Sequence, residues 1–445
     1  MRKYFLLALA AVFMLSFVGC SYDPNISDDD VLPDDYKPSA EGYTYTILSD
    51  LRSMKSLCDT SSDSEISDKL KKHYETIEKE LGCTISLQIT TDTIESDVFR
   101  TSAGKSGRAD LLETDASTVS RLLDGGYLTS LEDMGLDSSD EKFGLASQKA
   151  FFEKDGKTYG FFPLLLGVSA PTYSYALYYN ESLVKKYSGE DIAVLSENGN
   201  WTREKFSEIA KAVTTDDAGR KTYAFVTPTT EFPEFIDAAL FSSGQTAVKN
   251  GKCGYEKYPT LNTVDWIKKM VSTDRVTLSA SGDYADILNF AEGNTAFLVS
   301  SVRTGLSMNS DFPQQSLGKD LRLTSFPGMS SGASFGKNDT FYAITTQGKK
   351  NRADSAIILD RICSLMEGDD SDSWKKEAET TYFFENSDFS TYITNLETAG
   401  NDGLLDIPDF ADALHEAWTL VVRGSKSTAQ AYEEIENVIN GLAAN

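Results

Sequence analysis

The sequence predicts an α/β protein of two lobes, each a mainly parallel sheet flanked by helices. Segments with the alternation of a strand take turns with segments of helical spacing, first over residues 43–126 and again from residue 173 onward. The chain has 445 residues, which is enough for two or three domains. Its content of 40% hydrophobic and 25% charged residues is that of an ordinary globular protein.

The first region is interpreted as alternating strands and helices, which favours a parallel sheet. The expected elements are strands over residues 43–48, 84–90 and 109–112, a helix over 64–81 that stops at Gly82, and a helix that ends at Gly125-Gly126. Ligands of open α/β sheets bind at the carboxyl ends of the strands. Asp50 to Arg52 and Thr114 to Ser117, which follow two of these strands, are therefore expected to face one crevice.

The second region repeats the pattern with shorter strands. The expected elements are strands over residues 173–179, 223–226, 295–300, 321–326 and 340–345, and helices after Thr202 and over 261–273, 352–366, 408–423 and 428–442. The last helix has the clearest signal, because Ser427 and Gln430 form a capping box ahead of its apolar stripe.

The first twenty residues predict export. Arg2-Lys3 precedes an apolar run, Phe5 to Val18, that is too short to span a bilayer. Phe17-Val18-Gly19-Cys20 resembles the bacterial lipobox, with Phe17 where Leu is usual. We expect residues 1–19 to be a lipoprotein signal peptide and an acylated Cys20 to hold the protein on the extracellular face of the cell membrane. The alternative is an ordinary secretory signal with an incidental cysteine.

Residues 20–42 are expected to form an acidic, flexible tether. The stretch carries Ser27-Asp28-Asp29-Asp30 and Pro33-Asp34-Asp35 and few large apolar side chains. No second apolar run of about 18 residues follows, so nothing else in the sequence is expected to span a membrane.

Charge and metal-ligating residues exclude two functional classes. The chain has 42 Lys and Arg against 68 Asp and Glu, a net charge of −26, and so acidic a surface repels nucleic acid. The only histidines are His73 and His415, which argues against a His-rich metal site, and no cofactor is expected. Four further cysteines fit no zinc spacing and are left either as free thiols or as disulfides: Cys58, Cys83, Cys253 and Cys363.

Catalytic motifs are incomplete. Gly328-Met329-Ser330-Ser331-Gly332 has the letters of a nucleophile elbow, but no helical pattern follows the serine, which favours a flexible loop. A pair of glycosidase carboxylates stays open, because 68 acidic residues supply many chance pairs and none stands out.

From residue 43 to the end, the chain resembles the lipid-anchored extracellular solute-binding proteins of bacterial ABC importers, in the maltose-binding-like group (family 1). The segments that match the family's patterns, in order, are Ser106-Gly107-Arg108-Ala109-Asp110, Gly126 to Leu131, Asp155-Gly156-Lys157-Thr158-Tyr159-Gly160 with Pro163, Leu177-Tyr178-Tyr179-Asn180-Glu181, Trp201 to Phe206, Glu292 to Phe297, Trp418 to Gly424 and Ala429 to Ile435. Two of them also have a local explanation. Asp155-Gly156 suits a hairpin turn, and Trp201 is expected to anchor the helix that follows rather than to bind a sugar.

The resemblance implies a periplasmic-binding-protein-like clamp with a hinge of several crossovers. On this basis residues 43–165 and 340–398 would form the N-terminal lobe, and 166–339 and 399–445 the C-terminal lobe. The chain would cross between lobes near 164–173, 337–341 and 395–405. A small solute, most often a carbohydrate or oligosaccharide in this family, would bind between the lobes and pass to ABC permease subunits, and the protein would act as a monomer and not as an enzyme.

The resemblance also implies ligand contacts. Matching to the family places the following residues at the cleft: Asp50, Thr114, Asp115, Ser117, Tyr173, Phe232, Glu234, Arg303 and Phe410. Arg303 stands where sugar-binding relatives often have Trp. An arginine can stack on a sugar ring or bind a carboxylate through two hydrogen bonds, so an acidic sugar or another anionic solute is also considered.

Two other functions stay open. The chain could be a surface lipoprotein glycoside hydrolase, in which case oligosaccharides would be cleaved instead of returned intact. It could also be a binder that senses or adheres without a transporter.

Overall fold

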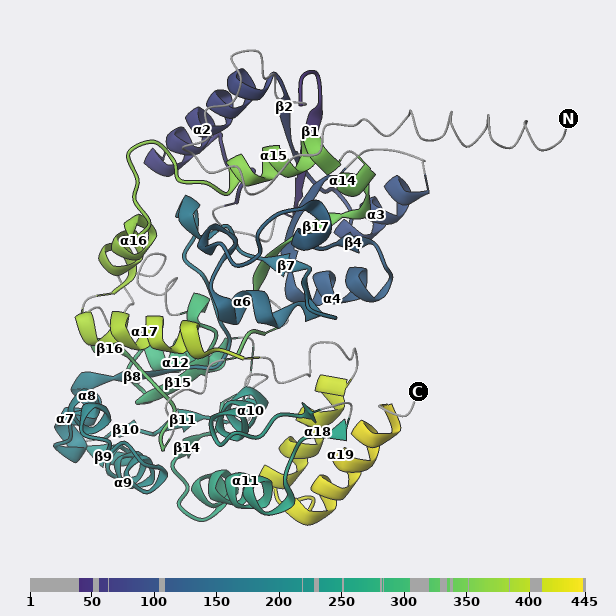
Figure 1. Cartoon of the computed structure of the whole chain (residues 1–445). Coiled ribbons are helices and arrows are strands. Elements are labelled where there is room, and N and C mark those ends of the chain that lie inside the picture. Colours follow the sequence, from purple (N-terminus) through teal and green to yellow (C-terminus); the bar gives the residue numbers. More distant parts are fainter. Residues whose placement is uncertain are drawn as a thin grey trace, which may run out of the picture.

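The computed structural model describes residues 40–50, 56–62, 64–103, 109–217, 219–227, 232–249, 252–280, 282, 284–304, 320–328, 334–336, 339–350, 352–383, 385–400 and 410–442. The predicted signal peptide, Cys20 and all but the end of the predicted tether lie outside these residues. The described chain forms two α/β halves, an upper and a lower one in Figure 1, which confirms the predicted fold class.

The upper half is built on a six-stranded sheet. Its strands run in the order β2 (Thr84–Ile89), β1 (Thr44–Ser49), β3 (Leu111–Asp115), β17 (Thr340–Thr345) and β4 (Leu128–Thr129), with β7 (Gly160–Phe161) also on β17. The strand β1 is parallel to β2 and β3, as predicted. The late strand β17 enters beside β3 in the opposite direction, so a segment from far along the sequence completes this sheet.

Helices cover the upper sheet. They are α2 (Glu65–Leu81), α3 (Ile94–Ser102), α4 (Ala116–Asp124), α5 (Leu131–Met134), α6 (Ala146–Phe151), α14 (Thr346–Lys350) and α15 (Arg352–Ile362). The Ser64 side chain accepts from the Ser67 amide at the start of α2, and Gly82 ends this helix with φ 66°. The hairpin of β5 (Glu153–Lys154) and β6 (Lys157–Thr158) turns at Asp155-Gly156, as predicted, with φ of 54° and 72°.

The lower half is centred on β8 (Ala176–Asn180). This strand lies between β15 (Phe297–Ser300) and β16 (Leu321–Thr324) and is antiparallel to both, while β11 (Phe225–Val226) is parallel to β14 (Thr277–Leu278). The strands around β8 therefore depart from the expected mainly parallel arrangement. The alternation of apolar and polar residues predicts that a segment is a strand, but it does not predict whether the neighbouring strand runs parallel or antiparallel. The sequence therefore did not predict the antiparallel pairing around β8.

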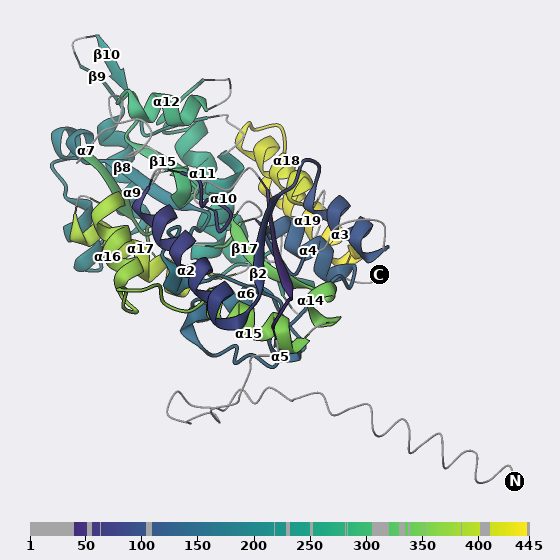
Figure 2. The same ribbon diagram turned by 90° about the horizontal axis from the view of Figure 1, so that it is seen from above.

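The lower half is rich in helices and small hairpins. Its helices are α7 (Glu181–Ser188), α8 (Ile192–Glu197), α9 (Arg203–Val213), α10 (Phe232–Ser242), α11 (Lys257–Ser272), α12 (Ala285–Ala291), α18 (Phe410–Val422) and α19 (Thr428–Leu442). One hairpin, β9 (Thr215–Asp217) and β10 (Arg220–Thr222), extends away from the body in Figure 2. The other joins β12 (Val248–Lys249) to β13 (Lys252–Cys253).

Two more helices, α16 (Ser373–Tyr382) and α17 (Asn386–Thr398), lie between the halves in Figure 1. Helix α17 contacts α6 above it and β16 below it. The central strand β8 divides its side chains between two hydrophobic clusters: Leu177 and Tyr179 join the core of the lower half, and Ala176 and Tyr178 join the other.

Trp201 anchors its helix, as expected. Its side chain is buried, its Nε1 donates to the Ser325 carbonyl at 2.8 Å, and it meets Phe206 of α9 edge-on with ring centroids 5.8 Å apart.

The four cysteines in the described residues are free thiols. Burial raises the pKa of the Cys58 thiol to about 12. No helix within the described ranges is both long enough and apolar enough to cross a membrane.

Candidate functional site

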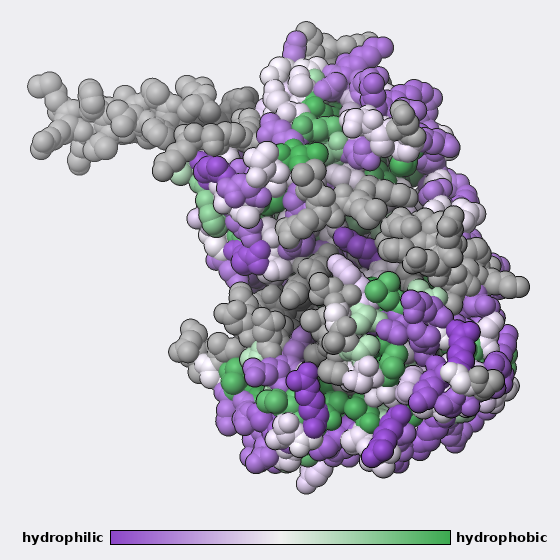
Figure 3. Space-filling model, turned by 180° about the vertical axis from the view of Figure 1, so that it is seen from behind, coloured by the Kyte–Doolittle hydropathy of each residue, from purple (hydrophilic) through white to green (hydrophobic). Residues whose placement is uncertain are grey.

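The candidate site lies where the two halves meet, midway down the molecule in Figure 3. Two strand ends of the upper sheet meet near this boundary. Asp50 follows β1 directly and Thr114 is near the end of β3, and the Thr114 hydroxyl donates to Asp50 Oδ2 at 3.4 Å. The structure thus brings Asp50 and Thr114 together, while Leu51 and Arg52 lie outside the described residues.

Asp115 and Ser117 also serve the start of α4. Asp115 caps this helix, because its Oδ1 accepts from the Thr118 amide at 2.8 Å. Ser117 lies in the first turn and accepts from the Arg121 guanidinium. In register, Asp115 stands opposite Thr340, the first residue of β17.

Arg303 reaches this place from the other half. It follows β15 by three residues, and its Nη2 donates to the Thr340 hydroxyl at 2.8 Å. The next residue back, Asp339, is buried, and burial raises its pKa, although the nearby Arg303 charge offsets part of the effect. Arg303 thus links the second half to the strand that carries Thr340, beside the Asp50, Thr114 and Asp115 group.

The chain segments predicted to cross between lobes lie side by side here. Asp339 accepts from the Thr172 hydroxyl at 2.8 Å and from the Gly336 amide at 2.7 Å. Ser334 forms a β-bridge with Ser174 and donates its hydroxyl to the Gly400 carbonyl at 2.9 Å. Residues at or beside all three predicted crossings are therefore joined by hydrogen bonds.

Tyr173 has a structural position in this conformation. Its side chain is 0% exposed, stacks on Tyr392 of α17 with ring centroids 6.1 Å apart, and accepts from Asn395 Nδ2 at 3.2 Å. It offers no free face to a ligand here. The side chains of Phe232, Glu234 and Phe410, at the starts of α10 and α18, lie outside the described part of the chain.

The structure adds a polar cluster that sequence reasoning missed. Asp237 of α10 lies 2.5 Å from His415 Nε2 of α18, measured from its Oδ2, and the Tyr175 hydroxyl is 3.5 Å from the same oxygen. Asp237 and His415 are 178 positions apart, so no local pattern connects them. The available signal was Asp237 itself, a lone acid in the apolar run Phe235 to Phe241.

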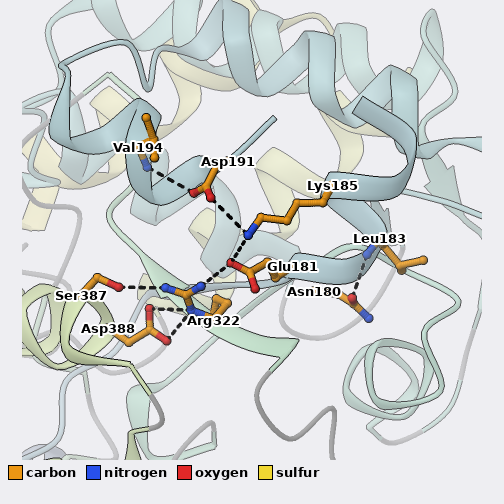
Figure 4. Close-up of polar contacts among 9 residues, drawn as sticks. All are labelled: Asn180, Glu181, Leu183, Lys185, Asp191, Val194, Arg322, Ser387 and Asp388. Atoms are coloured by element: carbon orange, nitrogen blue, oxygen red, sulfur yellow. Dashed lines mark hydrogen bonds and ion pairs between the residues drawn. The ribbon is translucent and has the colours of Figure 1, made fainter. Parts of the chain in front are cut away.

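A second ionic cluster surrounds Arg322 of β16 (Figure 4). Its Nε donates to both carboxylate oxygens of Asp388, at 2.9 and 3.1 Å, its Nη2 donates to Ser387 at 2.8 Å, and its Nη1 contacts Glu181. Lys185 continues the network from Glu181 to Asp191. Because Arg322 is only 6% exposed and all three of its nitrogens have partners, this cluster ties α17 to the lower sheet and is not a ligand site.

A buried carboxylate in the upper half has a similar structural role. Glu113 of β3 is fully buried and accepts from the Tyr342 hydroxyl at 2.7 Å, from the Leu57 amide at 3.2 Å and from the Ser56 hydroxyl. Burial raises its pKa, and these hydrogen bonds offset part of the rise. Within the described residues, no group of three or more His, Cys, Asp or Glu side chains is arranged to hold a metal ion.

Comparisons with known proteins fit this architecture. The family model for bacterial extracellular solute-binding proteins matches residues 72–357, more than half of the chain. No curated protein sequence matches the chain.

Solved structures share the fold at low identity. A cyclic α-maltosyl-1,6-maltose binding protein from Arthrobacter globiformis is 13% identical with a TM-score of 0.64, over 90% of this chain and 99% of the other. The sugar-binding protein MalE from Xanthomonas citri is 12% identical with a TM-score of 0.64, over 90% and 97%. An ABC substrate-binding protein from Listeria monocytogenes in complex with cycloalternan is 16% identical with a TM-score of 0.59, over 90% and 99%. On the family match, the chain belongs to the bacterial extracellular solute-binding proteins.

Proposed function

We propose that this protein captures a small solute of the carbohydrate or oligosaccharide class between its lobes and delivers it to an ABC permease. One observation carries the proposal: Arg303 of the lower half bonds to Thr340 beside Asp50, Thr114 and Asp115 of the upper half. Carboxylates, hydroxyls and a guanidinium are the groups that bind sugar hydroxyls. The cyclic α-maltosyl-1,6-maltose and the cycloalternan named for two of the structures above belong to those proteins and support this proposal by analogy.

Capture would work by closure of the hinge. The joined segments around Asp339 and Ser334 would act as the hinge, with residues 43–165 and 340–398 moving against 166–339 and 399–445. The solute stabilises the closed form only by contacting both lobes, so its affinity reflects these contacts minus the cost of closure. The closed form would then dock on the permease, and the solute would leave chemically unchanged.

Family membership places the protein outside the cytoplasmic membrane. We propose further that it is a monomer held at the outer face of the cell membrane by lipid on Cys20, with residues 20–42 as the tether. Mass spectrometry of protein from membranes would detect an acylated Cys20 at the N-terminus. An unmodified mature protein that starts elsewhere would contradict this.

A thermal-shift screen tests the proposed function. The chain without its predicted signal peptide is titrated with maltose, cycloalternan, acarbose and tagatose, and each binder is followed by calorimetry. A solute that binds only the folded protein stabilises it by about 2.7 kcal/mol at 100 times its Kd, which raises the melting temperature. The sugar is then recovered and examined by mass spectrometry. Cleaved sugar would favour the hydrolase alternative, and no shift with any sugar would contradict the carbohydrate class.

A further inference from the structure

The Asp237 carboxylate is buried but only half satisfied. Its side chain is 1% exposed, and one oxygen, Oδ2, faces both His415 Nε2 and the Tyr175 hydroxyl. The other oxygen, Oδ1, is also buried and has no hydrogen-bond partner among the described residues. Most buried carboxylate oxygens are paired, because an unpaired acceptor costs free energy, so this atom calls for a donor.

The cluster borders the region where the two halves meet. Tyr175 follows Ser174, which forms the β-bridge to Ser334 and contacts Asp339. Tyr175 is one of four described non-glycine residues with positive φ, at 63°, and such a backbone conformation is costly unless the surroundings enforce it. The Tyr175 hydroxyl thus faces Asp237 from a chain segment that lies where the two halves meet.

Asp237 and His415 both lie in the second turn of their helices. Asp237 comes five residues after Phe232, where α10 begins, and His415 comes five residues after Phe410, where α18 begins. His415 has a side-chain exposure of 25%, so its imidazole remains accessible from solvent.

We propose that Asp237 and His415, with Tyr175, form the second-lobe half of the solute site and select a neutral polyhydroxylated solute over an acidic one. The inference rests on the proposed function. The imidazole of His415, which is 25% exposed, bonds a solute hydroxyl, and Asp237 Oδ1, which is buried in this conformation, accepts from a neighbouring hydroxyl once the site rearranges around the solute. A solute carboxylate would instead face the charge of Asp237.

The test compares Asp237→Asn and His415→Ala with a matched control. His73 of α2 is the other histidine, and its Nε2 contacts the Arg361 and Ile362 carbonyls, away from the interlobe region. Calorimetry measures Kd for the sugar of the panel above that binds most tightly. We expect at least tenfold weaker binding in both cluster variants and a change below twofold in His73→Ala. His415→Gln, which keeps a hydrogen-bonding side chain, should recover part of the loss.

The same screen tests the solute class when sialic acid and digalacturonate are added to it. Neutral sugars should raise the melting temperature of the wild type, and the two acidic sugars should not. Tight binding of an acidic sugar, or unchanged Kd in folded Asp237→Asn and His415→Ala proteins, would overturn the inference. If Asp237→Asn fails to fold, the His415 variants decide. A wild type that binds no sugar contradicts the proposed function itself, so the two failures are distinct.

Discussion

Arg303 is a side chain of the lower half that also contacts the upper half. It extends from the lower half and donates to Thr340, which begins a strand of the upper sheet. A guanidinium has five N–H donors, so one hydrogen bond to Thr340 leaves others for a solute. A residue that touches both lobes and the solute contributes more to the closed state than to the open one.

Arg303→Ala should weaken sugar binding at least tenfold, or about 1.4 kcal/mol. Calorimetry with the tightest-binding sugar of the panel measures the change. Arg361→Ala is the matched control, because that arginine is half exposed on α15 and pairs with Glu80 far from the interlobe region. Equal affinity in the Arg303 and Arg361 variants would show that Arg303 does not contact the solute.

Glu113 predicts a specific dependence of stability on pH. Burial raises its pKa above the value in an unfolded chain, about 4.3. The folded protein therefore keeps this proton in a pH range where the unfolded chain has lost it. It follows that the carboxyl contributes most to the free energy of unfolding below about pH 4, and that this contribution falls as pH rises through the folded pKa.

Glu113→Gln removes this titration. Urea unfolding from pH 4 to 7 should show the free energy of unfolding of the wild type declining relative to that of the variant. The difference between the two proteins isolates Glu113, because all other groups titrate in both. A difference that stays constant with pH, or grows in favour of the wild type, would contradict the raised pKa.

At the scale of elements, the predicted helices are those whose apolar stripe is continuous. Helix α19 has an uninterrupted stripe, and its capping box is present, with Ser427 and Gln430 bonded to each other's amides at 3.2 Å. Helix α17 was missed because its buried face includes the polar residues Asp388 and Asn395. Helix α3 was missed because it is short and buries only Ile94 and Val98.

The candidate site likewise includes residues whose proximity the sequence predicts and residues whose proximity it does not. Asp50 and Thr114 could be predicted because the ends of parallel strands meet at one edge of a sheet. The Asp237 and His415 pair could not, because it depends on how α10 packs on α18, and no sequence period encodes that packing. Tyr173 was predicted at the cleft, but the packing of α17 covers it, which is again a tertiary effect.

The salt bridge between β16 and α17 allows a test at this scale. Arg322→Met leaves the nearly buried Asp388 carboxylate without its cation, and breaking a buried pair in this way costs roughly 3–5 kcal/mol. Urea unfolding measures the loss. The double variant Arg322→Met, Asp388→Leu should recover much of the stability, because it leaves no unpaired charge. A single variant as stable as the wild type would show that the pair does not hold α17 in place.

At the scale of the whole molecule, closure would depend on the joint where chain segments are predicted to cross between the halves. A hydrophobic cluster fills the helical core of the lower half, and a second one fills the upper half, extends under α17 and continues into the lower sheet through Tyr178, Leu298 and Leu323. Hydrogen bonds among Thr172, Ser174, Ser334, Asp339 and Gly400 link the crossing segments above this apolar contact. Closure on a solute would therefore require the halves to move about the crossing segments while the shared apolar contacts adjust.

Gly336→Ala should damage this joint. An added Cβ would lie 1.8 Å from Ser174 Oγ, so the strand through Ser174 or the one through Ser334 must shift. Overpacking of this kind costs about 1–3 kcal/mol, and we expect a lower melting temperature together with weaker sugar binding. Gly441→Ala is the control, because its Cβ would meet nothing within 4 Å. If Gly336→Ala binds the panel sugar as tightly as Gly441→Ala, the joint tolerates displacement and closure does not depend on its geometry.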